Sequence, residues 1–213
     1  MTARLMLSVL WCITAAVAQD RLTSQEVLRN VQKQYVGITS ATASFVQKVT
    51  LRFGNKEQQQ SGTVKIKQGN KYRVETPDQR LIADGKTVWI VSTANNQVLI
   101  DSFKENARVF SPERFLLGLP DDFSAKELKR EQGLVKISLE PGAASAKTGH
   151  IRTMTAWIRE KDWTVVRIVY TDRNRAQYDI TLTEVRLNAP VSDAEFAFEP
   201  PAGMQVVDLR KGQ

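Results

Sequence analysis

The sequence predicts a mostly β protein (α+β) built on one long, curved antiparallel sheet with a few short helices. Three observations support this. Apolar and polar residues alternate with period two over most of the chain, turn residues interrupt the alternation, and one amphipathic helical segment precedes it. The 213 residues contain no low-complexity linker or internal repeat, so a single domain is the simplest organisation.

The first 18 residues have the pattern of a cleaved secretory signal peptide. Arg4 precedes an apolar run that is too short for a permanent membrane span, and Ala16-Val17-Ala18 fits a cleavage site. We expect residues 1–18 to be removed and residues 19–213 to form one soluble periplasmic domain. Cys12, the only cysteine, lies within the signal, so the exported domain would have neither a disulfide nor a thiolate.

The chain is basic, with a formal net charge of +7. Cleavage would remove only one basic residue, Arg4, so the excess persists. A basic protein in the periplasm is attracted to anionic membrane surfaces or acidic partners. An ordinary solvated surface explains the charge equally well. Nucleic-acid binding is not expected, because the charges are scattered and export removes the usual partner.

A helix is predicted just after the signal. Thr23 and Glu26 have the spacing of a capping box, and Gly37 is a natural stop. The apolar residues between them recur at helical spacing: Val27, Leu28, Val31 and Tyr35.

About eleven strands joined by short turns are predicted, which implies antiparallel connections. The clearest hairpin signal is Asp84-Gly85. In a later strand, Val166, Ile168 and Tyr170 are expected to share one face. The clearest alternating runs cover residues 45–53, 63–67, 71–75, 80–83, 86–91, 135–140, 154–158, 166–170 and 178–183. Too few helical residues remain to fill the apolar face, so the sheet either closes into a barrel or encloses a cavity.

A second, short helix is predicted after Ser111, with Pro112 at its first position. Its large apolar side chains must cover something: Phe115, Leu116, Leu117 and Leu119. They are either ordinary core residues or a lid over an opening in the sheet.

Residues for catalysis are scarce. His150 is the only histidine and lies in a turn rich in small residues, so neither a metal pair nor a serine triad is expected. Asp84, Asp121 and Asp122 have the positions of ordinary turn residues. We therefore expect no enzyme, no metal and no cofactor.

Four segments resemble the outer-membrane lipoprotein carrier (LolA) family. They are Ala43-Ser-Phe-Val-Gln47, residues 62–77 ending in Tyr-Arg-Val-Glu-Thr-Pro, Ala83-Asp-Gly-Lys-Thr-Val-Trp89, and Phe196-Ala-Phe-Glu-Pro-Pro-Ala-Gly203. Each segment is only moderately specific. Together, in this order and behind a signal peptide, they make the resemblance strong over residues 19–213.

The resemblance implies an unclosed half-barrel with helices over its mouth. It implies a monomeric periplasmic carrier that shields lipoprotein acyl chains between the inner and outer membranes. Its partners would be acylated lipoproteins, an inner-membrane ABC-type lipoprotein-releasing complex and, in many bacteria, an outer-membrane acceptor. Two alternatives stay open: a paralogue that binds another lipid, and a non-carrier sensor domain that binds a partner protein or peptide.

The resemblance also implies which residues contact lipid. On the sheet these are Phe45, Val49, Val64, Ile66, Tyr72, Val74 and Trp89, and on the lid Phe115, Leu116, Leu117 and Leu119. Core filling is the alternative for each aromatic residue. In the family an arginine, followed by a proline, ties the lid shut by hydrogen bonds, and here Gln68-Gly69 stand at those positions. Gln68 and Arg73 are the candidates for a substitute latch.

Overall fold

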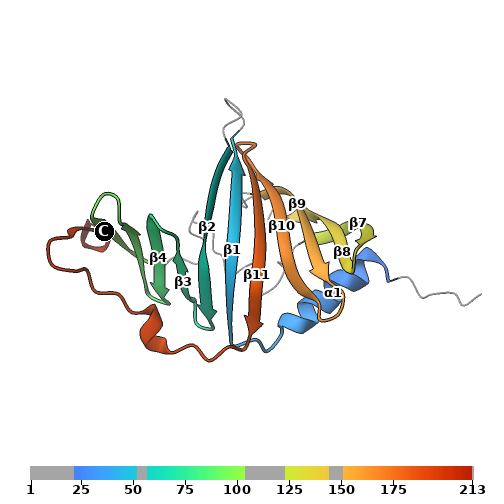
Figure 1. Cartoon of the computed structure of the whole chain (residues 1–213), viewed down its shortest axis with the longest axis horizontal. Helices are drawn as coiled ribbons and strands as arrows, with labels where there is room; N and C mark the ends of the chain where they lie inside the picture. Colours follow the sequence, from blue (N-terminus) through green and yellow to red (C-terminus); the bar gives the residue numbers. More distant parts are fainter. Residues whose placement is uncertain (1–21, 52–56, 104–122, 144–150, 213) are drawn as a thin grey trace, which may run out of the picture.

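The computed structural model describes residues 22–51, 57–103, 123–143 and 151–212 (Figure 1). One helix, α1 (Ser24–Tyr35), precedes the first strand. The first run of strands is β1 (Ser40–Thr50), β2 (Glu57–Lys67), β3 (Lys71–Glu75), β4 (Gln79–Asp84), β5 (Thr87–Ser92) and β6 (Gln97–Ser102). The second is β7 (Phe123–Glu131), β8 (Leu134–Pro141), β9 (Ile151–Arg159), β10 (Thr164–Asp172) and β11 (Gln177–Leu187). The C-terminal elements are the 3₁₀ turn η1 (Asp193–Phe196), strand β12 (Gln205–Asp208) and the 3₁₀ turn η2 (Leu209–Gly212).

All the strands described form one 12-stranded sheet that does not close on itself. Its order is β12-β6-β5-β4-β3-β2-β1-β11-β10-β9-β8-β7. Two antiparallel meanders therefore meet where β1 pairs with β11 (Figure 1). The predicted mostly β, unclosed half-barrel is confirmed. The strand count exceeds the expected eleven, and β12, at four residues, is too short to show a period of two in the sequence.

The capping box of α1 is present. The Thr23 N–H donates to Glu26 Oε2 (2.7 Å), and the Glu26 N–H donates to Thr23 Oγ1 (3.2 Å). The predicted apolar face is buried, with Val27, Leu28 and Val31 fully covered. The helix therefore packs this face against the sheet, where it contacts β7 and β10.

We call the face of the sheet that carries α1 the inner face and the opposite face the outer face. The main core cluster of the described residues lies on the inner face and runs across both meanders. Register shows this continuity, because Phe45 of β1 is opposite Leu182 of β11, and Ile168 of β10 is opposite Ile180 of β11. Residues in register share a face, so the two meanders present one apolar surface.

One expected face assignment is wrong. Val166 does not share the inner face with Ile168, because a bulge inserts one extra residue into β10. Val165 and Arg167 are opposite the adjacent residues Ile158 and Trp157, so Val166 has no partner in β9. Val165 is fully buried instead, and Val166 is half-buried.

Residues 189–208 form a C-terminal strap that runs from the end of β11 across the outer face to the far edge of the sheet (Figure 1). There β12 pairs in parallel with β6. Phe196 is fully buried where η1 meets β3 and β4. The Phe198 ring lies 6.5 Å from the ring of Trp89, within a second apolar cluster built on Val91, Val98 and Ile100.

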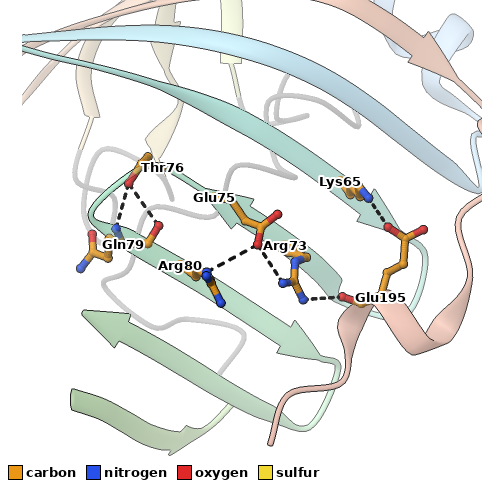
Figure 2. A network of polar contacts seen from close by, with 7 residues as sticks. All are labelled: Lys65, Arg73, Glu75, Thr76, Gln79, Arg80 and Glu195. Atoms are coloured by element: carbon orange, nitrogen blue, oxygen red, sulfur yellow. Dashed lines mark hydrogen bonds and ion pairs between the residues drawn. The ribbon is translucent and has the colours of Figure 1, made fainter. Parts of the chain in front are cut away.

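Ion pairs also hold the strap (Figure 2). Lys65 binds the Glu195 carboxylate, and Arg73 Nη1 donates to the backbone oxygen of Glu195 (3.0 Å). The Asp193 carboxylate lies 2.7 Å from Lys67 Nζ and 3.1 Å from Lys71 Nζ. Two acidic residues of the strap thus meet a row of cations on β2 and β3.

These contacts make strap stability depend on pH. Hydrogen bonds from Lys67 and Lys71 lower the pKa of Asp193, and the hydrogen bond from Lys65 lowers the pKa of Glu195. A carboxylate with a lowered folded-state pKa stabilises the fold above its unfolded pKa, and this stabilisation is lost as pH falls through the folded-state pKa.

We predict that the variant Asp193→Asn/Glu195→Gln is less stable than the wild type at neutral pH. Its free energy of unfolding should also fall less steeply between about pH 5 and pH 2. Urea unfolding across this range measures both effects. Glu199→Gln, which changes an exposed strap carboxylate, is the matched control and should leave the slope unchanged. Equal slopes for the wild type and the double variant would contradict the assignment.

Candidate functional site

The candidate site is the apolar inner face, and the structure brings several predicted residues together there. Phe45, Val64, Ile66 and Tyr72 are all buried in the main cluster. Val74 packs against its margin. Alternation places them on one face, since Ile66 is in register with Tyr72 and Val64 with Val74.

Val49 is half-buried near the far end of β1, opposite Tyr178 of β11. It lies on the same face as Phe45, four residues away along the strand. Val49 thus extends the predicted set toward the end of the sheet distant from the β11–strap junction.

Trp89 lies on the outer face, away from the other predicted residues. It is in register with Ile82 and Ile100 and packs beside Phe198 of the strap. Its neighbours Val88 and Ile90 are the β5 residues that join the inner cluster. The Asp-Gly hairpin that precedes Trp89 is present, with Gly85 at φ 95° and Asp84 Oδ1 accepting hydrogen bonds from the Lys86 and Thr87 N–H groups (2.8 and 2.7 Å).

The predicted lid residues Phe115, Leu116, Leu117 and Leu119 lie outside the described residues, as do His150 and the predicted signal peptide. Their roles stay predictions.

The two latch candidates contact other parts of the fold. Gln68 Nε2 donates to the backbone oxygen of Ile38 (3.1 Å), which ties the end of β2 to the α1–β1 connection. Arg73 is on the outer face and binds Glu75 (2.8 Å) as well as the strap (Figure 2). Whether either residue also acts as a latch stays a prediction.

The second meander supplies half of the inner face, and sequence reasoning did not assign its residues to the site. The buried members are Phe123, Val135, Ile137, Leu139, Met154, Ala156, Ile158, Val165, Ile168, Tyr170, Ile180 and Leu182. Their period-two alternation was visible in the sequence. The segments that carry the family resemblance, however, lie mostly in the first meander, so no motif marked these residues.

A pair of stacked tyrosines, Tyr170 and Tyr178, belongs to this half of the inner face. The rings of Tyr170 and Tyr178 lie 4.6 Å apart and are nearly parallel, at 6°. Burial raises the pKa of both phenols, so both stay neutral at physiological pH. The pair therefore adds aromatic surface and no charge.

The electrostatics of the inner face suit an apolar ligand. Its clustered side chains are uncharged, and the only buried polar residues described are Ser40, Thr87 and Thr164. One half-buried carboxylate, Asp101 of β6, is in register with Val88 and so lies on this face near its margin. Within the part of the chain that the structure describes, no three His, Cys, Asp or Glu residues group as metal ligands. This face can hold hydrocarbon, and its described residues include no acid–base pair for catalysis.

Gly62 makes room for Phe45 in this face. The two residues are in register, and a Cβ on Gly62 would lie 3.0 Å from Phe45 Cε1 and would collide with the Glu75 carbonyl oxygen. A backbone oxygen in a paired strand cannot easily move away. Glycine is therefore required here by close packing.

We predict that Gly62→Ala lowers the free energy of unfolding by about 1–3 kcal/mol, the usual cost of overpacking. Ser61→Ala, at the exposed neighbouring position, should change it by less than about 0.5 kcal/mol. Urea unfolding of both variants tests this. A Gly62→Ala protein as stable as the wild type would show that the sheet relaxes here at no cost.

Comparison with known proteins agrees with the geometry. The sequence model of the family described as "Outer membrane lipoprotein carrier protein LolA" matches residues 37–199. The outer-membrane lipoprotein carrier protein of Leptothrix cholodnii is 30% identical over 198 residues, covering 91% of this chain and 87% of that protein. The protein of the same name from Pasteurella multocida is 29% identical, covering 96% of this chain and 91% of that protein.

The fold also occurs in solved structures. An uncharacterised conserved protein from Thermus thermophilus superposes with a TM-score of 0.55 at 18% identity, covering 86% of this chain and 98% of that one. At this identity the likeness concerns the fold alone. No helix among the described residues is both long and apolar enough to cross a membrane.

Proposed function

Because this chain belongs to the outer membrane lipoprotein carrier protein (LolA) family, we propose that it is a periplasmic carrier for lipoproteins. It shields their acyl chains from water between the inner and outer membranes. The observation that carries the proposal is the neutral apolar inner face, which runs without interruption from β5 across the β1–β11 junction to β8.

The size of the hydrophobic effect explains why a carrier needs such a face. Each methylene group exposed to water costs ~0.8 kcal/mol, so an acyl chain with about a dozen of them costs on the order of 10 kcal/mol. Cargo therefore passes from one apolar environment to another and does not dissociate into water. A face whose clustered side chains are apolar suits repeated transfer, because it holds a chain without fixing its position.

The proposal extends to location, partners and chemistry. The chain works in the periplasm after export, receives acylated lipoproteins from an inner-membrane ABC-type complex, and delivers them to the outer membrane, with or without a protein acceptor. It acts as a monomer and is not an enzyme. The family membership supports each of these statements, and the apolar inner face supports the binding of acyl chains.

The decisive experiment measures binding of a diacylated lipopeptide by native mass spectrometry. The wild type should form a one-to-one complex. Val74→Asp places a carboxylate at the margin of the inner face and should weaken binding by roughly tenfold or more, because the bound chain would contact a charge.

Val46→Asp is the matched control, since it makes the same substitution at an exposed outer-face position of β1. It should bind like the wild type. Equal weakening by both variants, or no binding by the wild type, would contradict the proposal. Binding of free phospholipid without lipopeptide would favour a paralogue for another lipid, and failure to bind either would favour a partner-binding domain.

A further inference from the structure

The wall of the half-barrel splits between β10 and β11. The two strands pair only from Arg167 opposite Thr181 to Thr171 opposite Gln177. Beyond that point, residues 182–187 of β11 stay paired with β1, whereas residues 164–165 of β10 stay paired with β9. In Figure 1 the two strands meet at the top of the view and separate toward the bottom.

Two bulges border the split and account for it. One is the extra residue Val166 in β10. The other lies in β11, where Glu184 and Val185 together are opposite Ala43 and Glu184 has a φ of 53°. A bulge bends its strand and increases local twist. Bulges at the same end of both neighbours turn the strands apart.

A pocket of about 630 Å³ occupies the split. Its apolar lining comes from Leu134, Trp157, Val166 and Leu182. Leu182 is also a buried member of the inner cluster, so the pocket reaches from the outer face to the hydrophobic core. Its volume is within the usual range for small-molecule sites, roughly 300–1,000 Å³.

Positive charge gathers beside the pocket. Lys136 Nζ lies 4.9 Å from the centre of the Trp157 ring, and the Arg167 guanidinium lies 4.6 Å from it. Arg167 is neutralised by Asp179, with contacts of 2.6 and 2.9 Å. Lys136 forms no ion pair with a described carboxylate, and Lys129 of β7 is directly opposite it, also without one.

Two lysines opposite each other without an acidic partner repel. An anion placed between them would relieve this repulsion. One carboxylate, Glu131, also lines the pocket and opposes such an anion, so the net charge offered by the three side chains is +1.

We propose that this pocket binds a single alkyl chain of a monomeric anionic amphiphile, a long-chain carboxylate or phosphate. The chain packs against Trp157, Val166 and Leu182, and the anionic group lies at Lys136 and Lys129. This site goes beyond the carrier function, because it lies on the outer face and needs neither a lipoprotein nor access to the inner face.

The probe is dodecanoic acid with a photoreactive diazirine at the chain end, used below the concentration at which it aggregates. After illumination, peptide mapping by mass spectrometry should place the label on Leu134, Trp157 or Val166. Labelling confined to inner-face residues of β2 and β3 would overturn the proposal, as would no labelling at all.

Affinity measurements test the charges. Lys136→Gln should weaken binding of the fatty acid roughly two- to fivefold, and Glu131→Gln should strengthen it by a similar factor. The corresponding neutral alcohol should respond to neither substitution. Lys48→Gln is the control, since Lys48 is on the outer face of β1 and paired with Glu57 at 3.6 Å. If the two substitutions did not change the affinity for the fatty acid in opposite directions, the assignment of the anion site would be overturned.

Two further arms distinguish this pocket from a membrane-binding surface and from the inner face. Vesicles of anionic phospholipid test a membrane surface, and their capture by the protein without binding of the monomeric probe would overturn the proposal. Val74→Asp should leave labelling of the outer pocket unchanged while it weakens lipopeptide binding. Failure of the carrier function and failure of this site are therefore distinguishable.

Discussion

The pairing of β1 with β11 is the constraint on which the rest of the structure depends. It joins the two meanders through strands that are far apart in the sequence, and hydrogen bonds reinforce the end of the pairing where β1 begins and β11 ends. The Thr39 N–H donates to Asn188 Oδ1 (2.9 Å), and Ser40 Oγ donates to the Ala189 carbonyl oxygen (2.6 Å). Without this junction each meander would expose an apolar face that its own few strands could not cover. With it, Phe45 and Leu182 continue one surface across the sheet.

The two faces of the sheet have different roles. Period-two alternation sends the apolar side chains of the core cluster inward and leaves cations such as Lys65 and Arg73 on the outer face. The strap covers the outer face of the first meander, where it adds Phe198 to the second apolar cluster and buries Phe196 beside β3 and β4. Asp193 and Glu195 of the strap pair with the cations there. Across the second meander, beyond the reach of the strap, Trp157 is half-buried and Lys136 lies over its ring.

The alternation of apolar and polar residues within single strands predicted which face carries much of the candidate site. Phe45, Val64, Ile66 and Tyr72 lie together because each alternates correctly within its own strand and neighbouring strands pair without a shift in β2–β3. Pattern was insufficient for Trp89, because identifying its face requires the register of β5 with β4 and the position of the strap. It was insufficient again at Val166, because the bulge puts Val165 in place of Val166 on the face of Ile168, although Val166 and Ile168 alternate in the sequence.

The sequence by itself determined the mostly β class, the capped α1, the Asp-Gly hairpin and the family, since each depends on residues close together in the chain. Tertiary structure alone decided the β1–β11 junction, the path of the strap and the split between β10 and β11. These depend on pairing between segments more than a hundred residues apart or on bulges that shift register, and no local period records either. Composition and alternation therefore predicted that the sheet has one apolar face. The extent of this face across both meanders depends on the register of distant strands, which only the tertiary structure shows.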